Sequence, residues 1–119
     1  IELPDSDKRL IDKIINIKDQ GMATSGDYRN FFIYDNIRYS HIIDPKTGYP
    51  IEHSLASVTV IAPSCMEADG LATSFLVMGT KNALKLVEKL ENIECLLIER
   101  ASNSYKRYMS SGFNEFILE

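Results

Sequence analysis

The sequence predicts a single α+β domain in which two helices pack on one face of an antiparallel or mixed sheet. Three observations favour this class. The chain has 119 residues, the length of one domain. Its pattern runs from strands to two adjacent helical segments and back to strands, an order typical of α+β folds. Apolar residues make up 45% and charged residues 25% of the chain, so a folded core is expected and a disordered or fibrous chain is excluded.

The first part of the chain predicts a β-hairpin after an ambiguous start. Residues 1–20 fit both a helical and a strand period. The run 24–28 (TSGDY) is compatible with a plain loop or with a loop that approaches a phosphate through its donors. Residues 31–34 and 37–43 are aromatic and β-branched, and the turn formers Asp35-Asn36 separate them, which predicts two paired strands.

The middle of the chain predicts a loop, a buried strand and a helix. Two prolines and a glycine in 44–50 favour a loop, and 57–62 has the composition of a buried strand. Ser64 and Glu67 have capping-box spacing, and Gly79 is a natural helix stop. The apolar stripe between them has a helical period and comprises Ala68, Leu71, Ala72, Phe75 and Leu76.

The last forty residues predict a second helix and three strands. Thr80 is a candidate cap for this helix, which we expect to run to about Leu90. Turn-forming clusters then separate three apolar segments, as an antiparallel meander requires. These predicted strands are 93–99, 105–109 and 113–118.

Charge and cysteine content exclude several classes of site. Thirteen basic and seventeen acidic residues give a net charge of −4, which argues against a nucleic-acid or membrane surface built on bulk charge. No run approaches the ~18 apolar residues of a membrane span. Cys65 and Cys95 are too few for a metal framework, and we expect both thiols to be buried and reduced. Because the first residue is Ile1, we expect a processed, trimmed or partial chain.

His41 is the first candidate for chemistry, because it lies late in the predicted strand 37–43, just before the Pro/Gly loop. A neutral imidazole there could accept a proton from a hydroxyl, or it could simply bond to backbone. Asp44 could orient that imidazole, or it could begin the turn at Pro45. His53 lies in a polar loop and has no evident partner.

Asp69 and Thr73 are the second candidate, because a spacing of four places both side chains on one helix face. A carboxylate and a hydroxyl suit Mg²⁺, which prefers hard oxygen ligands and keeps some waters. The pair is incomplete for an octahedral ion. A structural interpretation is also open, since an acid near a helix N-terminus is stabilised by the helix dipole.

Together these segments resemble the ApbE family, the FAD:protein FMN transferases once called thiamine biosynthesis lipoproteins. The resemblance rests on motifs in the family's order. These are 23–28 (ATSGDY), 39–48 (YSHIIDPKTG), 57–62 (SVTVIA), 67–75 (EADGLATSF) and Met78-Gly79.

The resemblance implies a Mg²⁺-dependent enzyme that cleaves the pyrophosphate of FAD, moves FMN to a threonine of an acceptor protein and releases AMP. His41 would be the general base on that threonine. Asp69 and Thr73 would bind Mg²⁺, with Ala72 next to the ion. Ile43 and Ser25 would contact the flavin nucleotide.

The family also implies a larger protein. Its members are roughly twice this length or more, and the chain resembles their T-fold-like C-terminal half, with residues 1–119 as one domain. We therefore expect a fragment, a chain completed by a partner or by a second copy, or a reduced relative. A non-catalytic flavin-binding or assembly module and an FAD pyrophosphatase stay open as alternatives. Many relatives are exported lipoproteins, which predicts a periplasmic or extracytoplasmic location, with membrane attachment only through a lipid anchor outside this chain.

Overall fold

Four strands form one antiparallel sheet in the computed structural model, which describes all 119 residues. The strands are β1 (Gly21–Gly26), β4 (Leu55–Ala62), β5 (Glu94–Arg100) and β6 (Tyr105–Met109), in the spatial order β1-β4-β5-β6. The predicted α+β class is therefore confirmed, with a sheet that is antiparallel throughout. All eight residues of β4 are buried, as expected for a central strand covered on both faces.

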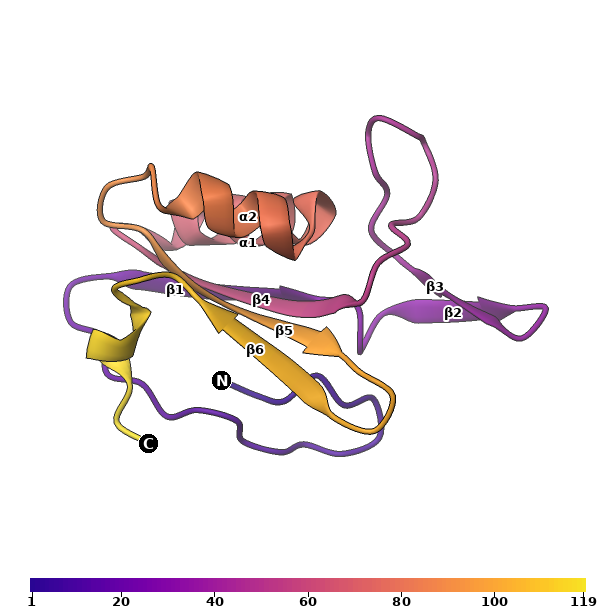
Figure 1. The fold of residues 1–119 in the computed structure, drawn as a ribbon, viewed down its shortest axis with the longest axis horizontal. Helices are drawn as coiled ribbons and strands as arrows, with labels where there is room; N and C mark the ends of the chain where they lie inside the picture. Colours follow the sequence, from indigo (N-terminus) through magenta and orange to yellow (C-terminus); the bar gives the residue numbers. More distant parts are fainter.

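Two helices cover one face of this sheet, as predicted (Figure 1). Helix α1 (Cys65–Met78) begins after Ser64, whose hydroxyl accepts the Glu67 backbone N–H at 3.2 Å. It ends at Gly79, whose positive φ of 83° suits a residue without a side chain. Helix α2 (Thr80–Val87) follows directly. Neither helix is long and apolar enough to cross a membrane.

The two faces of the sheet carry separate apolar clusters. On the helix side, Val58, Val60 and Ala62 of β4 contact the buried face of α1. On the opposite side, Ile61 belongs to a smaller cluster, which the two ends of the chain cover (Figure 1). Its buried members are Ile61, Leu96, Ile98 and Phe113.

A long excursion leaves the sheet between β1 and β4. It contains a separate two-stranded hairpin, β2 (Phe31–Tyr34) and β3 (Ile37–Ser40), which projects beyond the sheet in Figure 1. Asp35 and Asn36 both have positive φ, as the predicted two-residue turn requires. The excursion leaves and re-enters the sheet at adjacent points, where the Asp27 N–H donates to the Ala56 carbonyl at 3.1 Å.

Several predicted details are wrong. Strand β3 ends at Ser40, so His41 lies after the strand rather than within it. Residues 24–26 of the run 24–28 belong to strand β1 and are not a loop. Thr80 does not cap α2: its hydroxyl donates to Glu99 at 2.5 Å, and α2 ends at Val87.

Two further expectations fail near the chain ends and at the cysteines. The predicted strand 113–118 is a 3₁₀ helix, η1 (Phe113–Phe116), because the Phe113 side chain turns into the core. Residues 1–20 form neither a helix nor a regular strand and make only isolated bridges, such as Ile15 with Ile117. Cys95 is buried as expected, whereas Cys65 is exposed at the start of α1.

Candidate functional site

His41 is held by the backbone of the hairpin that precedes it. Its Nδ1 lies 2.7 Å from the Asn30 carbonyl oxygen. A carbonyl oxygen can only accept a hydrogen bond, so Nδ1 carries the proton in the neutral ring. This leaves the Nε2 lone pair free, on a side chain that is exposed to solvent. The geometry thus suits a proton acceptor at Nε2.

Asp44 begins a turn and is not the partner of His41. Its Oδ1 accepts the Lys46 N–H at 2.9 Å, and its own N–H donates to the Tyr49 carbonyl at 2.9 Å. Of the two interpretations that the sequence left open, the structure therefore favours the turn. The group that orients the imidazole is the Asn30 carbonyl, and no side-chain pattern could have indicated a backbone atom.

Asp69 and Thr73 both lie exposed on α1, as their spacing predicts. The Asp69 carboxylate has no hydrogen-bond or ion-pair partner in the protein and is free to bind a cation. The Thr73 Oγ1 lies 2.8 Å from the Oγ of Ser25 on β1. Ser25 pairs with Val58 of β4 and so lies on the helix side of the sheet. The structure thus brings together Ser25 and Thr73, two of the predicted site residues.

Ala72 and Ile43 are placed differently. Ala72 is fully buried in the helix-side core, and its methyl group offers no ligand atom, so only its backbone oxygen could approach an ion. Ile43 is half exposed and makes an isolated bridge with Pro50, which closes the loop after His41.

A hollow of about 750 Å³ lies between this loop and helix α1. Thr73 lines it from the helix, and Asp44 and Lys46 line it from the turn after His41. Lys46 has no ion-pair partner, so its ammonium group is available to a phosphate. Neither Lys46 nor Asn82 of α2, which also lines the hollow, could be singled out from the sequence, because Lys46 is only one letter of the motif 39–48 and Asn82 lies in no motif. His41 and Asp69 are not among the residues that line this hollow. Because both motifs would serve one phosphoryl centre, we predict that His41 faces the Asp69 and Thr73 surface.

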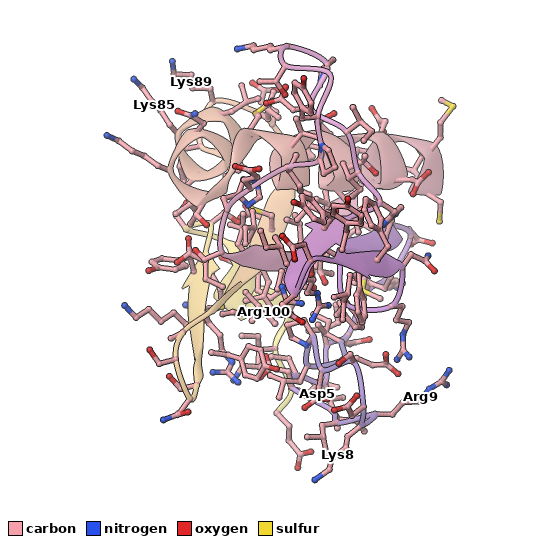
Figure 2. All side chains as sticks on the ribbon, turned by 90° about the vertical axis from the view of Figure 1, so that its right-hand side faces the viewer. Asp5, Lys8, Arg9, Lys85, Lys89 and Arg100 are labelled. Carbon is pink, nitrogen blue, oxygen red and sulfur yellow. The ribbon has the colours of Figure 1, made fainter.

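A second hollow, of about 600 Å³, lies at the base of the hairpin and is lined in part by His53. Arg100 donates two hydrogen bonds to the buried Asp27 carboxylate, at 2.6 and 3.0 Å. Burial and the neighbouring Arg100 charge lower the pKa of Arg38 in the same wall. Figure 2 shows Arg100 on the opposite side of the sheet from Lys85 and Lys89 of the α2 region.

The residues present fit a magnesium ion that is held only in part by protein. Asp69 and Thr73 offer hard oxygen atoms on one surface, and the Asp69 carboxylate is unpartnered. No group of three His, Cys, Asp or Glu side chains is clustered for a metal anywhere in the chain. Mg²⁺ is commonly bound by one or two carboxylates, substrate phosphates and waters, so this donor set is compatible with such a site.

Comparison with known proteins gives the relationships of the chain. A family model described as "ApbE family" matches residues 1–97. The chain belongs to the ApbE family. Within that family it is 48% identical over 98% of its length to an FAD:protein FMN transferase of Vibrio cholerae, of which it covers 35%. It is 40% identical over 99% of its length to the protein of the same name in Escherichia coli K12, of which it covers 33%.

Solved structures agree with this assignment. The ApbE flavin transferase of Vibrio cholerae matches 98% of the chain with a TM-score of 0.81 and 46% identity, over 36% of that protein. The ApbE protein of Thermotoga maritima matches all of it with a TM-score of 0.80 and 35% identity, over 38% of that protein. The chain thus spans about a third of the length of these ApbE relatives, less than the half that the sequence suggested.

Proposed function

We propose that this chain carries the catalytic base and part of the magnesium site of an FAD:protein FMN transferase, which attaches FMN to a threonine of an acceptor protein. The observation that carries the proposal is the similarity, over nearly the whole chain, to transferases of that name. The free Nε2 of His41 supports it, because the reaction needs a proton acceptor for a weak hydroxyl nucleophile.

In the proposed reaction the acceptor threonine attacks the phosphorus of the FMN half of FAD. A phosphoester bond forms, the P–O bond to AMP breaks, and AMP leaves. His41 Nε2 takes the threonine proton, while the Asn30 carbonyl holds Nδ1–H and stabilises the imidazolium that results. Lys46 lies where it can bind pyrophosphate oxygens.

Magnesium, held by Asp69 and Thr73 beside the backbone of Ala72, would supply charge neutralisation at the pyrophosphate. Ile43 and Ser25 contact the nucleotide in this proposal. The partners are an acceptor protein and a further portion of a longer protein, or a second copy, that completes the site. We further propose an extracytoplasmic location on the family resemblance.

The test is a chimera in which these 119 residues replace the aligned segment of the Vibrio cholerae relative. His41→Ala should lower the rate of acceptor flavinylation about 10²- to 10⁴-fold, the usual cost of losing a general base. FAD affinity should stay near that of the parent chimera, because Nε2 acts on the nucleophile. Flavin fluorescence of the acceptor in a gel measures transfer, and His53→Ala serves as the matched control, which we expect to retain transfer.

Separate product analysis distinguishes the alternatives. Release of AMP and FMN without labelling of the acceptor would favour an FAD pyrophosphatase instead. Tight FAD binding with neither product would favour a binding module. A His41→Ala chimera that flavinylates at the parental rate would mean that His41 is structural.

A further inference from the structure

Two neighbouring hydroxyl groups on α1 are bonded in different ways. Ser74 donates to the Gly70 carbonyl at 2.7 Å, one turn earlier in its own helix, as serine and threonine inside helices commonly do. Thr73 makes no such bond to the carbonyl of Asp69. Its hydroxyl instead meets Ser25 of strand β1 at 2.8 Å. The Thr73 side chain is therefore held by the sheet and not by its own helix.

This arrangement determines what the Thr73 hydroxyl can offer. A hydroxyl has one proton and two lone pairs, and it binds a cation through a lone pair, with its proton directed elsewhere. Either hydroxyl can donate across this contact, so the Ser25 oxygen can accept a hydrogen bond from Thr73. When the Thr73 hydroxyl donates its hydrogen bond to Ser25, its lone pairs face the exposed surface of α1. Thr73 shares that surface with Asp69, which lies one turn earlier.

We propose that Ser25 is a positioning residue for the magnesium site. Its oxygen accepts a hydrogen bond from the Thr73 hydroxyl and so fixes the Thr73 rotamer beside Asp69. The inference rests on the proposed function, because it takes Asp69 and Thr73 as cation ligands. The proton of Ser25 itself stays available to a phosphate oxygen, so this role adds to the nucleotide contact assigned to Ser25 above.

The experiment measures Mn²⁺ binding to the 119-residue chain without nucleotide, from the electron paramagnetic resonance signal of free Mn²⁺. Ser25→Ala should weaken Mn²⁺ binding about 10- to 100-fold, the usual effect of removing a group that orients a ligand. Ser25→Thr keeps a hydroxyl and should restore most of the affinity. Thr24→Val is the control. The Thr24 hydroxyl lies 2.8 Å from the Thr59 hydroxyl, and neither Ser25 nor Thr73 takes part in this contact. Loss of the Thr24 hydroxyl should therefore leave Mn²⁺ affinity unchanged.

A double-mutant cycle tests whether Ser25 acts through Thr73. In a Thr73→Val background the hydroxyl that Ser25 orients is gone, so Ser25→Ala should cause no further loss of Mn²⁺ affinity. An equal loss in both backgrounds would overturn the inference, because Ser25 would then act independently. Thermal unfolding followed by circular dichroism confirms that each variant is folded.

Asp69→Ala separates this inference from the proposed function. If Asp69→Ala abolishes Mn²⁺ binding and Ser25→Ala binds like the parent, the positioning role alone is wrong. If the 119-residue chain alone binds no Mn²⁺ at millimolar concentrations, the same variants are measured in the parent chimera with FAD, where the site is complete. If the chimera also binds no Mn²⁺, or if Asp69→Ala binds as well as the parent, the metal site of the proposed function is wrong, and the inference about Ser25 is overturned with it.

Discussion

A single backbone oxygen decides which nitrogen of His41 can act as a base. The sequence placed His41 among the candidates, and the family resemblance gave it a role. Neither could assign the tautomer, because the Asn30 carbonyl reaches the imidazole only after the hairpin has folded. The same is true of Thr73: spacing put it on one face with Asp69, but its contact with Ser25 depends on the packing of α1 against β1.

Because the Cys95 thiol is buried, we expect the free energy of unfolding to fall at alkaline pH. Burial, with the nearby Glu94 charge, raises its pKa from 9.0 to about 12. Between pH 9 and 12 the unfolded chain therefore releases a proton that the folded chain keeps. The thiol's contribution to stability is complete below pH 9 and falls above it, by up to about 1.4 kcal/mol per pH unit. Urea unfolding at pH 8, 9 and 10 should show a shallower decline for Cys95→Ala than for the parent.

Cys65→Ala is the matched control for this measurement, because the Cys65 thiol is exposed. The lysines and tyrosines are common to all three proteins, so any contribution they make cancels in the comparison. A Cys95→Ala variant whose free energy of unfolding declines as steeply as that of the parent would contradict the prediction.

At the scale of elements, the packing of β1 against α1 depends on Gly21. A Cβ at this position would lie 2.2 Å from the Cys65 backbone nitrogen, and backbone cannot move aside as a side chain can. We expect Gly21→Ala to lower the free energy of unfolding by about 3 kcal/mol, at the upper end of overpacking effects. Chemical denaturation measures this change.

Gly70 in α1 is the matched control, because nothing lies within 4 Å of a Cβ built there. Replacing an exposed glycine inside a helix with alanine typically stabilises by about 0.5 to 1 kcal/mol, and Gly70→Ala should do the same. If the two substitutions change stability in the same direction, the close approach of β1 to α1 does not explain the effect.

The elements that sequence reasoning missed are those whose conformation depends on distant contacts. Strand β1 begins and ends with glycine and contains only one residue type of high strand propensity, Thr24. It is a strand because β4 pairs with it along its full length. The segment after Gly112 has the composition of a strand but forms η1. By contrast, α1 and the β2–β3 hairpin were predicted well, because their capping and turn residues are local signals.

For the molecule as a whole, we expect the 119 residues alone to bind FAD weakly, with a Kd no tighter than high micromolar, and to self-associate. The two proposed side-chain ligands leave most of the octahedral magnesium shell to water and phosphate, and the hollow beside α1 is open to solvent with few apolar side chains in its lining. The hairpin exposes Phe32 by 52%, Ile33 by 66% and Tyr34 by 72%, an apolar surface that association would cover. Flavin fluorescence titration with Mg²⁺ and light scattering measure the two effects.

Ile33→Lys tests the association part, since a charge at the centre of the exposed hairpin should favour the monomer. The parent chimera with the Vibrio cholerae relative serves as the positive control for FAD binding. A monomeric 119-residue chain that binds FAD tightly and only with Mg²⁺ would contradict the expectation on both counts.

The excursion between β1 and β4 implies that two parts of the proposed site, the hairpin segment before His41 and helix α1, unfold locally at different rates. Strand β4 is buried along its whole length, whereas β2 and β3 pair only with each other. Amide hydrogen exchange reports the free energy of local opening, which is lowest where few buried contacts oppose it. Amides of 31–40 should therefore exchange well before those of β4 and α1, so that the segment leading to His41 opens while helix α1, which carries Asp69 and Thr73, stays closed. Equal protection of both regions would show that they open as one cooperative unit.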